Sequence, residues 1–284
     1  NLSMPGKFNT CILRSLKQDG IPLLRRLVRN NFYRTRAILK WNAENNIPLY
    51  RISSDLIPFG SHDLVSGWKW WEEEDFIEVS EDVKKIVKDN DLRITIHPGQ
   101  FNNLGSPVTK VVESTFKDLE YQTRLLEFFG GTDLILHVGG MYEGKIATMR
   151  RFRDRFLQLP ENTRSYLRLE NDDKVYTIFD VFNLCVDLNI KPMYDYHHDI
   201  CCPSIHPWET KDNLVPLWDG VRVKCHLSSG KSGRTDRAHS DYISEMTRSE
   251  FSFFFGDLDI DVMIEAKAKD LAVLELLKNG GFTW

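Results

Sequence analysis

The stretch "ITIHPGQFNN", residues 94–103, indicates the fold of this chain, because a buried strand ends here and a sharp turn follows. The isoleucines lie on one face of a predicted strand over residues 91–97, and His97 lies on the other face. The Pro-Gly pair then turns the chain, so that Phe101 stands on a tight loop. A possible metal ligand and a large aromatic side chain are thus expected close together at one end of a strand.

Six other short runs resemble this strand, and helical patterns separate them. Repeated β–α units predict a parallel sheet, and 284 residues suit a (β/α)8 TIM barrel of the α/β class. We therefore expect a single barrel domain over residues 1–284. The predicted strands are 47–53, 91–97, 133–138, 166–171, 191–196, 221–226 and 261–266, and the predicted helices are 80–90, 106–131, 176–189 and 271–281.

Only seven strands are predicted, so the first strand of an eight-stranded barrel has no counterpart among them. The chain begins with "NLSMPGKFNT" (1–10), which looks like a loop that follows a strand. We expect the first barrel strand to lie upstream of residue 1, or to be hidden in a segment without a clear pattern. The helix at 80–90 is expected to open with Ser80 in a capping box.

The composition is that of an ordinary soluble protein, with 42% hydrophobic and 27% charged residues. No apolar run approaches the ~20 residues of a membrane span, so we expect no membrane partner. The five cysteines fit neither a disulfide framework nor a zinc ribbon, which indicates a reducing, cytoplasmic compartment. The net charge of −4 argues against a general polyanion binder but allows a local basic groove. Basic clusters at 25–36, 145–155 and 230–237 could supply one or could be solvated surface.

Polar and aliphatic side chains alternate along five of the predicted strands. One face of each is aliphatic, as packing against outer helices requires, and the other face ends in a histidine or a glutamate. The carboxyl ends of all strands surround one mouth of a barrel, so these residues are expected to converge. They are His97, His137, Glu170, His226 and Glu265, joined by Asp195 and His198 from "YDYHHD" (194–199) and by His62 and His239 from loops that follow strands.

This concentration of imidazole and carboxylate groups predicts bound metal ions. Without cations the carboxylates would repel each other or lose their hydrogen-bond partners. Mixed imidazole and carboxylate ligands suit Zn²⁺ or Mn²⁺. So many ligands suit two or three ions rather than one.

Lys224 shares an inward face with His226, two residues further on. An ammonium beside several cations is disfavoured, so its pKa is expected to fall. A neutral amine can take up CO₂ and become a carbamate, which could bridge two metals. The alternative is an unmodified lysine that reaches a phosphate or Glu265.

Seven motifs together resemble the UV damage endonucleases, which are DNA-repair enzymes on a (β/α)8 barrel related to endonuclease IV. The resemblance runs from Asn1 to about Glu265. The motifs are "YRISSDLIPFGSH" (50–62), "HPGQF" (97–101), "HVGG" (137–140), "LEND" (169–172), "YDYHHD" (194–199), "KCHLSSG" (224–230) and "AHSDY" (238–242).

The resemblance implies an enzyme that cuts DNA 5′ of UV photoproducts, cyclobutane dimers and 6-4 photoproducts, with three metal ions, usually Mn²⁺. Zn²⁺ and Mg²⁺ remain possible. It places the family's carboxylated lysine on Lys224. The implied metal ligands are His62, His97, His137, Glu170, Asp195, His198, His226, His239 and Glu265, and Glu170, Lys224, His226 and Glu265 form the catalytic group.

The resemblance also implies a lesion-probing pair, which falls on Gln100 and Phe101. Many members of the family have tyrosine at the second position, so the phenol hydroxyl is absent here. A lesion-contacting asparagine falls on Asn1, whereas the family's probing tyrosine in the first strand has no counterpart. Phe101 could stack in a gap in the duplex, or it could pack under a neighbouring loop.

The predicted reaction is metal-assisted hydrolysis of a phosphodiester in UV-damaged double-stranded DNA. Lys231 and Arg234 are candidates to hold backbone phosphates. We expect a monomer that works at the nucleoid or in the nucleus. The alternatives are a metal-dependent sugar isomerase on the same barrel, an abasic-site endonuclease like endonuclease IV, and a metal- or DNA-binding protein without activity.

Overall fold

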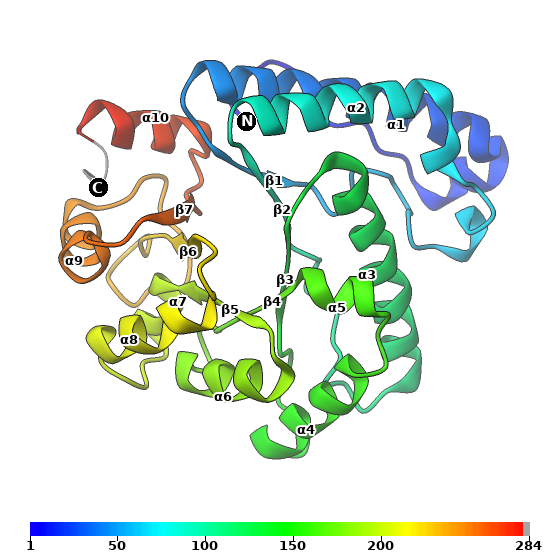
Figure 1. The fold of residues 1–284 in the computed structure, drawn as a ribbon. Coiled ribbons are helices and arrows are strands. Elements are labelled where there is room, and N and C mark those ends of the chain that lie inside the picture. The colour runs from blue at the N-terminus through cyan, green and yellow to red at the C-terminus, as the bar shows by residue number, and fades with distance from the viewer. Residues whose placement is uncertain (281–284) are drawn as a thin grey trace.

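The computed structural model describes residues 1–280, and its centre is a parallel sheet whose seven strands follow one another in chain order (Figure 1). Each strand pairs with the next through parallel hydrogen bonds. The sheet curves into a nearly closed barrel, which confirms the predicted fold class. The strands are β1 (Leu49–Ile52), β2 (Arg93–Ile96), β3 (Asp133–His137), β4 (Leu167–Glu170), β5 (Lys191–Asp195), β6 (Val223–Leu227) and β7 (Ile260–Ile264).

Helices surround the sheet and cover its aliphatic face (Figure 1). The helices are α1 (Leu13–Glu44), α2 (Glu74–Asp89), α3 (Thr109–Phe129), α4 (Lys145–Phe156), α5 (Glu161–Tyr166), α6 (Ile178–Leu188), α7 (Tyr196–Cys201), α8 (Pro207–Leu217), α9 (Glu245–Phe255) and α10 (Asp270–Lys278), with 3-10 turns η1 (Asp63–Val65) and η2 (Trp70–Glu72). No helix within residues 1–280 is both long and apolar enough to cross a membrane.

The strand predictions agree with the structure within a few residues, but the helix predictions were incomplete. One helix was predicted too short, and six helices within residues 1–280, α1, α4, α5, α7, α8 and α9, were not predicted. The helix expected at 80–90 begins at Glu74, because acidic residues in its first turn and a buried Phe76 extend the pattern. Ser80 therefore does not cap it but donates a hydrogen bond to the carbonyl of Phe128. The long α1 was not predicted, since Gly20, in the left-handed region, and Pro22 interrupt its pattern. Position 281, the end of the helix expected at 271–281, lies outside the described residues.

The two edge strands of the barrel, β1 and β7, are joined by side chains rather than by backbone pairing in the described structure. Arg51 of β1 forms an ion pair with Glu265 at the end of β7. The amides of Leu2 and Ser3 bind the carboxylate of Asp270, so the first residues lie against this junction. No strand forms in residues 1–12.

Buried charges fill the amino-terminal end of the barrel. The guanidinium of Arg93 lies 2.8 Å from both Asp133 and Asp261, and that of Arg168 lies 2.8 Å from the other oxygen of Asp133. The ring of Trp218 lies 5.1 Å and 5.9 Å from the two guanidinium carbons. This layer closes the lower end of the barrel, so the opposite end is the open one.

Asp133→Asn is expected to lower the free energy of unfolding by about 3–5 kcal/mol at neutral pH, because two buried guanidiniums lose their shared carboxylate. Burial raises the pKa of Asp133, but Arg93 and Arg168 outweigh it and lower the value from 3.8 to about 2. A carboxylate with a lowered pKa stabilises the fold above its ordinary pKa, and this contribution is lost as the pH falls toward 2.

The measurement is urea unfolding of both proteins at neutral and at acidic pH. The difference between variant and wild type should shrink in acid. Asp259→Asn is the matched control, since Asp259 pairs with Arg222 at the surface and should matter little. An equal, small effect of both substitutions would contradict the role of the buried layer.

Candidate metal centre

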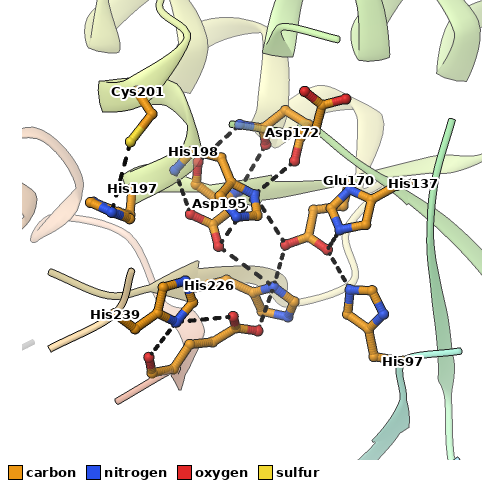
Figure 2. A network of polar contacts seen from close by, with 12 residues as sticks. His97, His137, Glu170, Asp172, Asp195, His197, His198, Cys201, His226 and His239 are labelled. Atoms are coloured by element: carbon orange, nitrogen blue, oxygen red, sulfur yellow. Dashed lines mark hydrogen bonds and ion pairs between the residues drawn. The ribbon is translucent and has the colours of Figure 1, made fainter. Parts of the chain in front are cut away.

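The open end of the barrel contains a cavity of about 1230 Å³. Strand alternation brings polar side chains to it, because the last inward residue of each strand faces the mouth. Figure 2 shows these side chains pointing toward one another from β2, β3, β4, β5 and β6. The residues that predict metal chemistry and line the cavity are His97, His137, His198, His239 and Glu265.

Glu170, at the end of β4, is the centre of the cluster and is fully buried. Its Oε2 lies 2.8 Å from Nε2 of His97 and 3.2 Å from Nε2 of His137. Its Oε1 lies 2.6 Å from Nδ1 of His226. The carboxylate at the end of β4 thus contacts histidines from the ends of β2, β3 and β6 (Figure 2).

A second group shares Glu170 with the first. Ligand atoms of Glu170, Asp195, His226 and Glu265 all lie within 4.8 Å of one another, as do those of His97, His137 and Glu170. Asp195 is buried, and its Oδ2 has no hydrogen-bond partner among the described residues. An unpaired buried carboxylate oxygen is costly, so the group fits a divalent cation that carboxylates and imidazoles bind.

Three histidines are oriented as metal ligands commonly are. Nδ1 of His198 lies 2.9 Å from the carbonyl oxygen of Asn171, and Nδ1 of His239 lies 2.8 Å from that of Glu265. Nδ1 of His97 lies 3.2 Å from the carbonyl oxygen of Pro98. A ring that donates Nδ1–H to a carbonyl keeps a lone pair on Nε2 for a metal.

Burial sets the direction of the pKa shift in two residues of the cluster, His226 and Asp195. It lowers the pKa of His226 to about 4, against the effect of neighbouring carboxylates, so the ring is neutral at pH 7. It raises the pKa of Asp195 to about 6, where the carboxylates of Glu170 and Glu265 add to the increase and His198 opposes it. Carboxylates in such contact favour a bound cation.

Lys224 lies below this cluster and is fully buried. Its Nζ has no hydrogen-bond partner among the described residues. Burial lowers the pKa of Lys224 to about 7, although Asp133 opposes the shift, and Arg51 and Arg93 contribute to it. The predicted fall of this pKa is therefore found, and the amine can exist without charge near neutral pH.

Two residues of the site were not predicted from the sequence. Nη2 of Arg51 lies 3.0 Å from Nε2 of His226, on the side of the ring opposite Nδ1, which lies against Glu170. Arg51 is the only charged residue of its predicted strand, and that could have indicated it. The side chain of Asn171 bonds the backbone N–H and C=O of Asp195 at 2.9 Å and 3.0 Å.

Of the remaining histidines, His62 and His197 do not face the metal-ligand cluster, whereas His198 does. His62 is exposed in the loop after β1, where its Nδ1 accepts from the amide of Leu64, and it does not line the cavity. His197 points toward Cys201 and the carbonyl of Asp236, away from the cluster (Figure 2). The short α7 turns adjacent side chains to different sides, so His198 alone of this pair faces the metal-ligand cluster.

The predicted DNA-contacting residues lie in different places. Asn1 and Gln100 line the cavity. Phe101 is 83% exposed, which excludes the alternative that it packs under a loop. Arg234 is paired with Glu250, and neither it nor Lys231 lines the cavity.

The chain matches the family model described as UV-endonuclease UvdE over residues 7–282. The chain belongs to the UV-endonuclease UvdE family. The UV DNA damage endonuclease of Halalkalibacterium halodurans is 35% identical over 92% of this chain and 84% of its own length. The UV-damage endonuclease of Schizosaccharomyces pombe is 33% identical over 95% of this chain but only 47% of its own length. Membership in UvdE confirms the predicted class, an endonuclease that acts on DNA.

Solved structures support the UvdE assignment. The crystal structure of SacUVDE superposes with a TM-score of 0.86 at 28% identity, covering 98% of this chain and 96% of that chain. Endonuclease IV from Thermus thermophilus shares the fold at a TM-score of 0.61 and 16% identity, over 86% of this chain and 93% of that one. D-psicose 3-epimerase from Clostridium cellulolyticum also shares it, at 0.55 and 13%, over 82% and 79%. The barrel alone does not separate nuclease from sugar enzyme, whereas the UvdE match does.

Glu170→Gln is expected to remove most bound metal and leave the fold intact, because glutamine keeps the shape but not the charge that both ligand groups share. The measurement is metal content after equilibration with Mn²⁺ and gel filtration, together with the unfolding curve. Wild type should hold more than one equivalent. Glu127→Gln, on α3 outside the barrel mouth, is the control, and equal metal content in all three proteins would contradict the assignment.

Proposed function

We propose that this protein nicks the backbone of double-stranded DNA on the 5′ side of UV photoproducts, with two or three divalent metals, Mn²⁺ foremost. The observation that carries the proposal is the convergence of two ligand groups on Glu170 inside the mouth of a UvdE barrel. The relatives named above act on UV-damaged DNA, as their names state. A monomer is sufficient, because a single chain supplies both groups, and its work would lie at the nucleoid or in the nucleus.

The ligand groups divide the site into two neighbouring positions. His97, His137 and Glu170 would hold one ion, and Glu170 would share a second with Asp195, His226 and Glu265. His198 and His239 present Nε2 to the same cavity. His62 would join only if its loop moved toward the barrel. Bound divalent ions would supply an activated water and stabilise the negative charge that develops on the phosphate and the leaving oxygen.

The side chains of this site prepare the hydrolysis without acting as nucleophiles. Glu170 and Glu265 provide acceptor oxygens that orient a water molecule beside the ligand groups. Arg51 holds Glu265 and lies on the cavity wall, where its guanidinium counters the negative charge of the substrate. The buried charged layer excludes solvent from the lower end of the barrel, so water reaches the site through the mouth.

We infer that Lys224 carries a carbamate in the working enzyme. The neutral amine attacks the carbon of CO₂; a C–N bond forms, one C=O π bond breaks with its electron pair going to oxygen, and the nitrogen releases a proton to water. This converts a buried cation below the ligand cluster into an anion with two oxygen ligands. The unpaired Nζ and the lowered pKa of Lys224 support the inference, and its position near Glu170 suits a bridge between two ions.

Gln100 and Phe101 are suited to probe the duplex. Both follow His97 on the loop that leaves β2, and Asn102 fixes that loop through the carbonyl of Gly99 at 3.1 Å and the carboxylate of Asp118 at 2.7 Å. A damaged dinucleotide is easier to unstack than an intact one. Phe101 would fill the resulting gap, and Gln100 would bond the bases left without partners.

The deciding experiment compares nicking of a duplex with a single cyclobutane dimer, a duplex with an abasic site and an intact duplex. Incision 5′ of the dimer in the presence of Mn²⁺ supports the proposal. Incision of the abasic duplex alone would favour an enzyme like endonuclease IV, and a preparation that is fully active without metal would refute the proposed chemistry.

Lys224→Ala is expected to lose nicking activity and to regain part of it with added short-chain carboxylic acids, which could occupy the place of the carbamate. The same acids should not stimulate the wild type. Labelling with carbon-13 bicarbonate gives an independent readout, since a carbamate signal should appear in wild type and be missing in the variant. A fully active enzyme without that signal would rule out the carbamate.

The combined variant Gln100→Ala/Phe101→Ala should retain its metal but lose discrimination between damaged and intact duplex. Base–aromatic stacking is worth roughly 1–3 kcal/mol, and about 1.4 kcal/mol corresponds to tenfold. The measurement is the ratio of dissociation constants for the two duplexes at one salt concentration. Leu64→Ala serves as a control for an exposed apolar side chain. An unchanged ratio would mean that damage is sensed elsewhere.

A further inference from the structure

Three exposed lysines line the cavity and have no role so far. They are Lys174, in the loop after β4, and Lys267 and Lys269, in the loop after β7; we call them the rim lysines. Within residues 1–280 none of them forms an ion pair. They are separate from Lys231 and Arg234, which lie outside the cavity, and Arg234 is already bound to Glu250.

The acidic residues next to the rim lysines already have other ion-pair or hydrogen-bond partners. Asp173 lies 3.4 Å from Arg237. Asp172 accepts the amide of Lys174 at 2.8 Å, and Asp270 accepts the amide of Ser3 at the same distance. Their negative charges are thus partly satisfied locally, while the ammonium groups of the rim lysines remain available to a ligand in the cavity.

The rim lysines stand on both sides of the ligand cluster. Strands β4 and β7 are three positions apart in a sheet of seven, so the loops that follow them flank the mouth. Glu170 ends one of these strands and Glu265 follows the other. A polyanion that contacts both loops must therefore pass over the metal-ligand cluster.

Lys269 also has an unusual backbone. Its φ of 51° and ψ of −122° place it in a backbone region that residues other than glycine rarely adopt. Hydrogen bonds hold this turn, from the amide of Lys269 to the carbonyl of Ala266 at 3.0 Å and from that of Lys267 to Ser240 at 3.0 Å. Glycine would relax this turn, so Lys269 holds a cationic side chain at the cavity at a cost in backbone strain.

We propose that the rim lysines bind backbone phosphates of duplex DNA and hold the duplex across the metal-ligand cluster. The inference rests on the proposed function and adds the electrostatic contacts that would hold the DNA in place. The protein has a net charge of −4, so long-range attraction to DNA is weak and binding depends on local cations. Two of these cations lie on the β7 side and one on the β4 side.

The test is the salt dependence of binding to an intact duplex, with the chain of residues 1–284 and its metal present. Each phosphate contact contributes about 0.9 to the slope of log K against log salt. Lys267→Ala/Lys269→Ala should therefore lower the slope by about 2, and Lys174→Ala by about 1. Lys88→Ala is the matched control: Lys88 is exposed at the end of α2, away from the mouth, and should leave the slope unchanged.

Lys269→Gly separates binding from folding. It should leave the melting temperature equal to or above that of wild type, because the strained turn relaxes, and still lower the slope by about 1. A raised melting temperature with an unchanged slope would overturn the proposal for Lys269. An equal loss of slope in Lys88→Ala would overturn it for all three lysines, because general charge would then explain the effect.

The outcome is independent of the lesion chemistry. If wild type fails to nick the dimer duplex but the slopes fall as expected, the proposed function fails and the phosphate contacts stand. If wild type nicks that duplex and the slopes do not change, the rim lysines are excluded and the proposed function stands.

Discussion

The constraint on which this molecule depends is the charge balance inside a nearly closed parallel sheet. Most side chains on the inner face are shielded from bulk water, so each buried charge there needs an opposite charge or a ligand. At the lower end the requirement is met by protein alone, where Asp133 and Asp261 neutralise Arg93 and Arg168. At the upper end the carboxylates outnumber their cationic partners, and this excess suits the mouth to bind metal ions.

The two ends of the barrel therefore have different tasks although they are built from the same strands. Inward residues at the start of a strand stabilise the fold, and inward residues at its end face the cavity. Lys224 lies between these layers; its Nζ has no hydrogen-bond partner among the described residues, and its charge interacts with Asp133 of the lower layer and Glu170 of the upper one. Each divalent ion bound above it adds positive charge, so its conversion to a carbamate would restore the balance of the interior.

In the function proposed above, recognition of DNA would be distributed over loops around the mouth, whereas the chemistry would be concentrated on strand ends. This separation allows the loop after β2 to present Phe101 to solvent while His97, on the same loop, is held against Glu170. It also places the rim lysines on loops, where their positive charges do not disturb the ligand groups. A net negative chain can then bind a polyanion through a few contacts, and release of the product does not require a large positive surface to be freed.

The sequence alone determined the strand alternation, and with it the barrel and most of the ligands, because a period of two fixes which side chains share a face. His97, His137, Glu170, His226 and Glu265 were predicted in this way. Only the tertiary structure decided that Arg51 ties β1 to β7, that Asn171 positions Asp195, and that His62 stays outside the cavity. These facts depend on contacts between segments far apart in the chain and on loop conformations, for which a local pattern carries no signal. The burial of Nζ of Lys224 without a hydrogen-bond partner among the described residues likewise exists only once the barrel has closed around it.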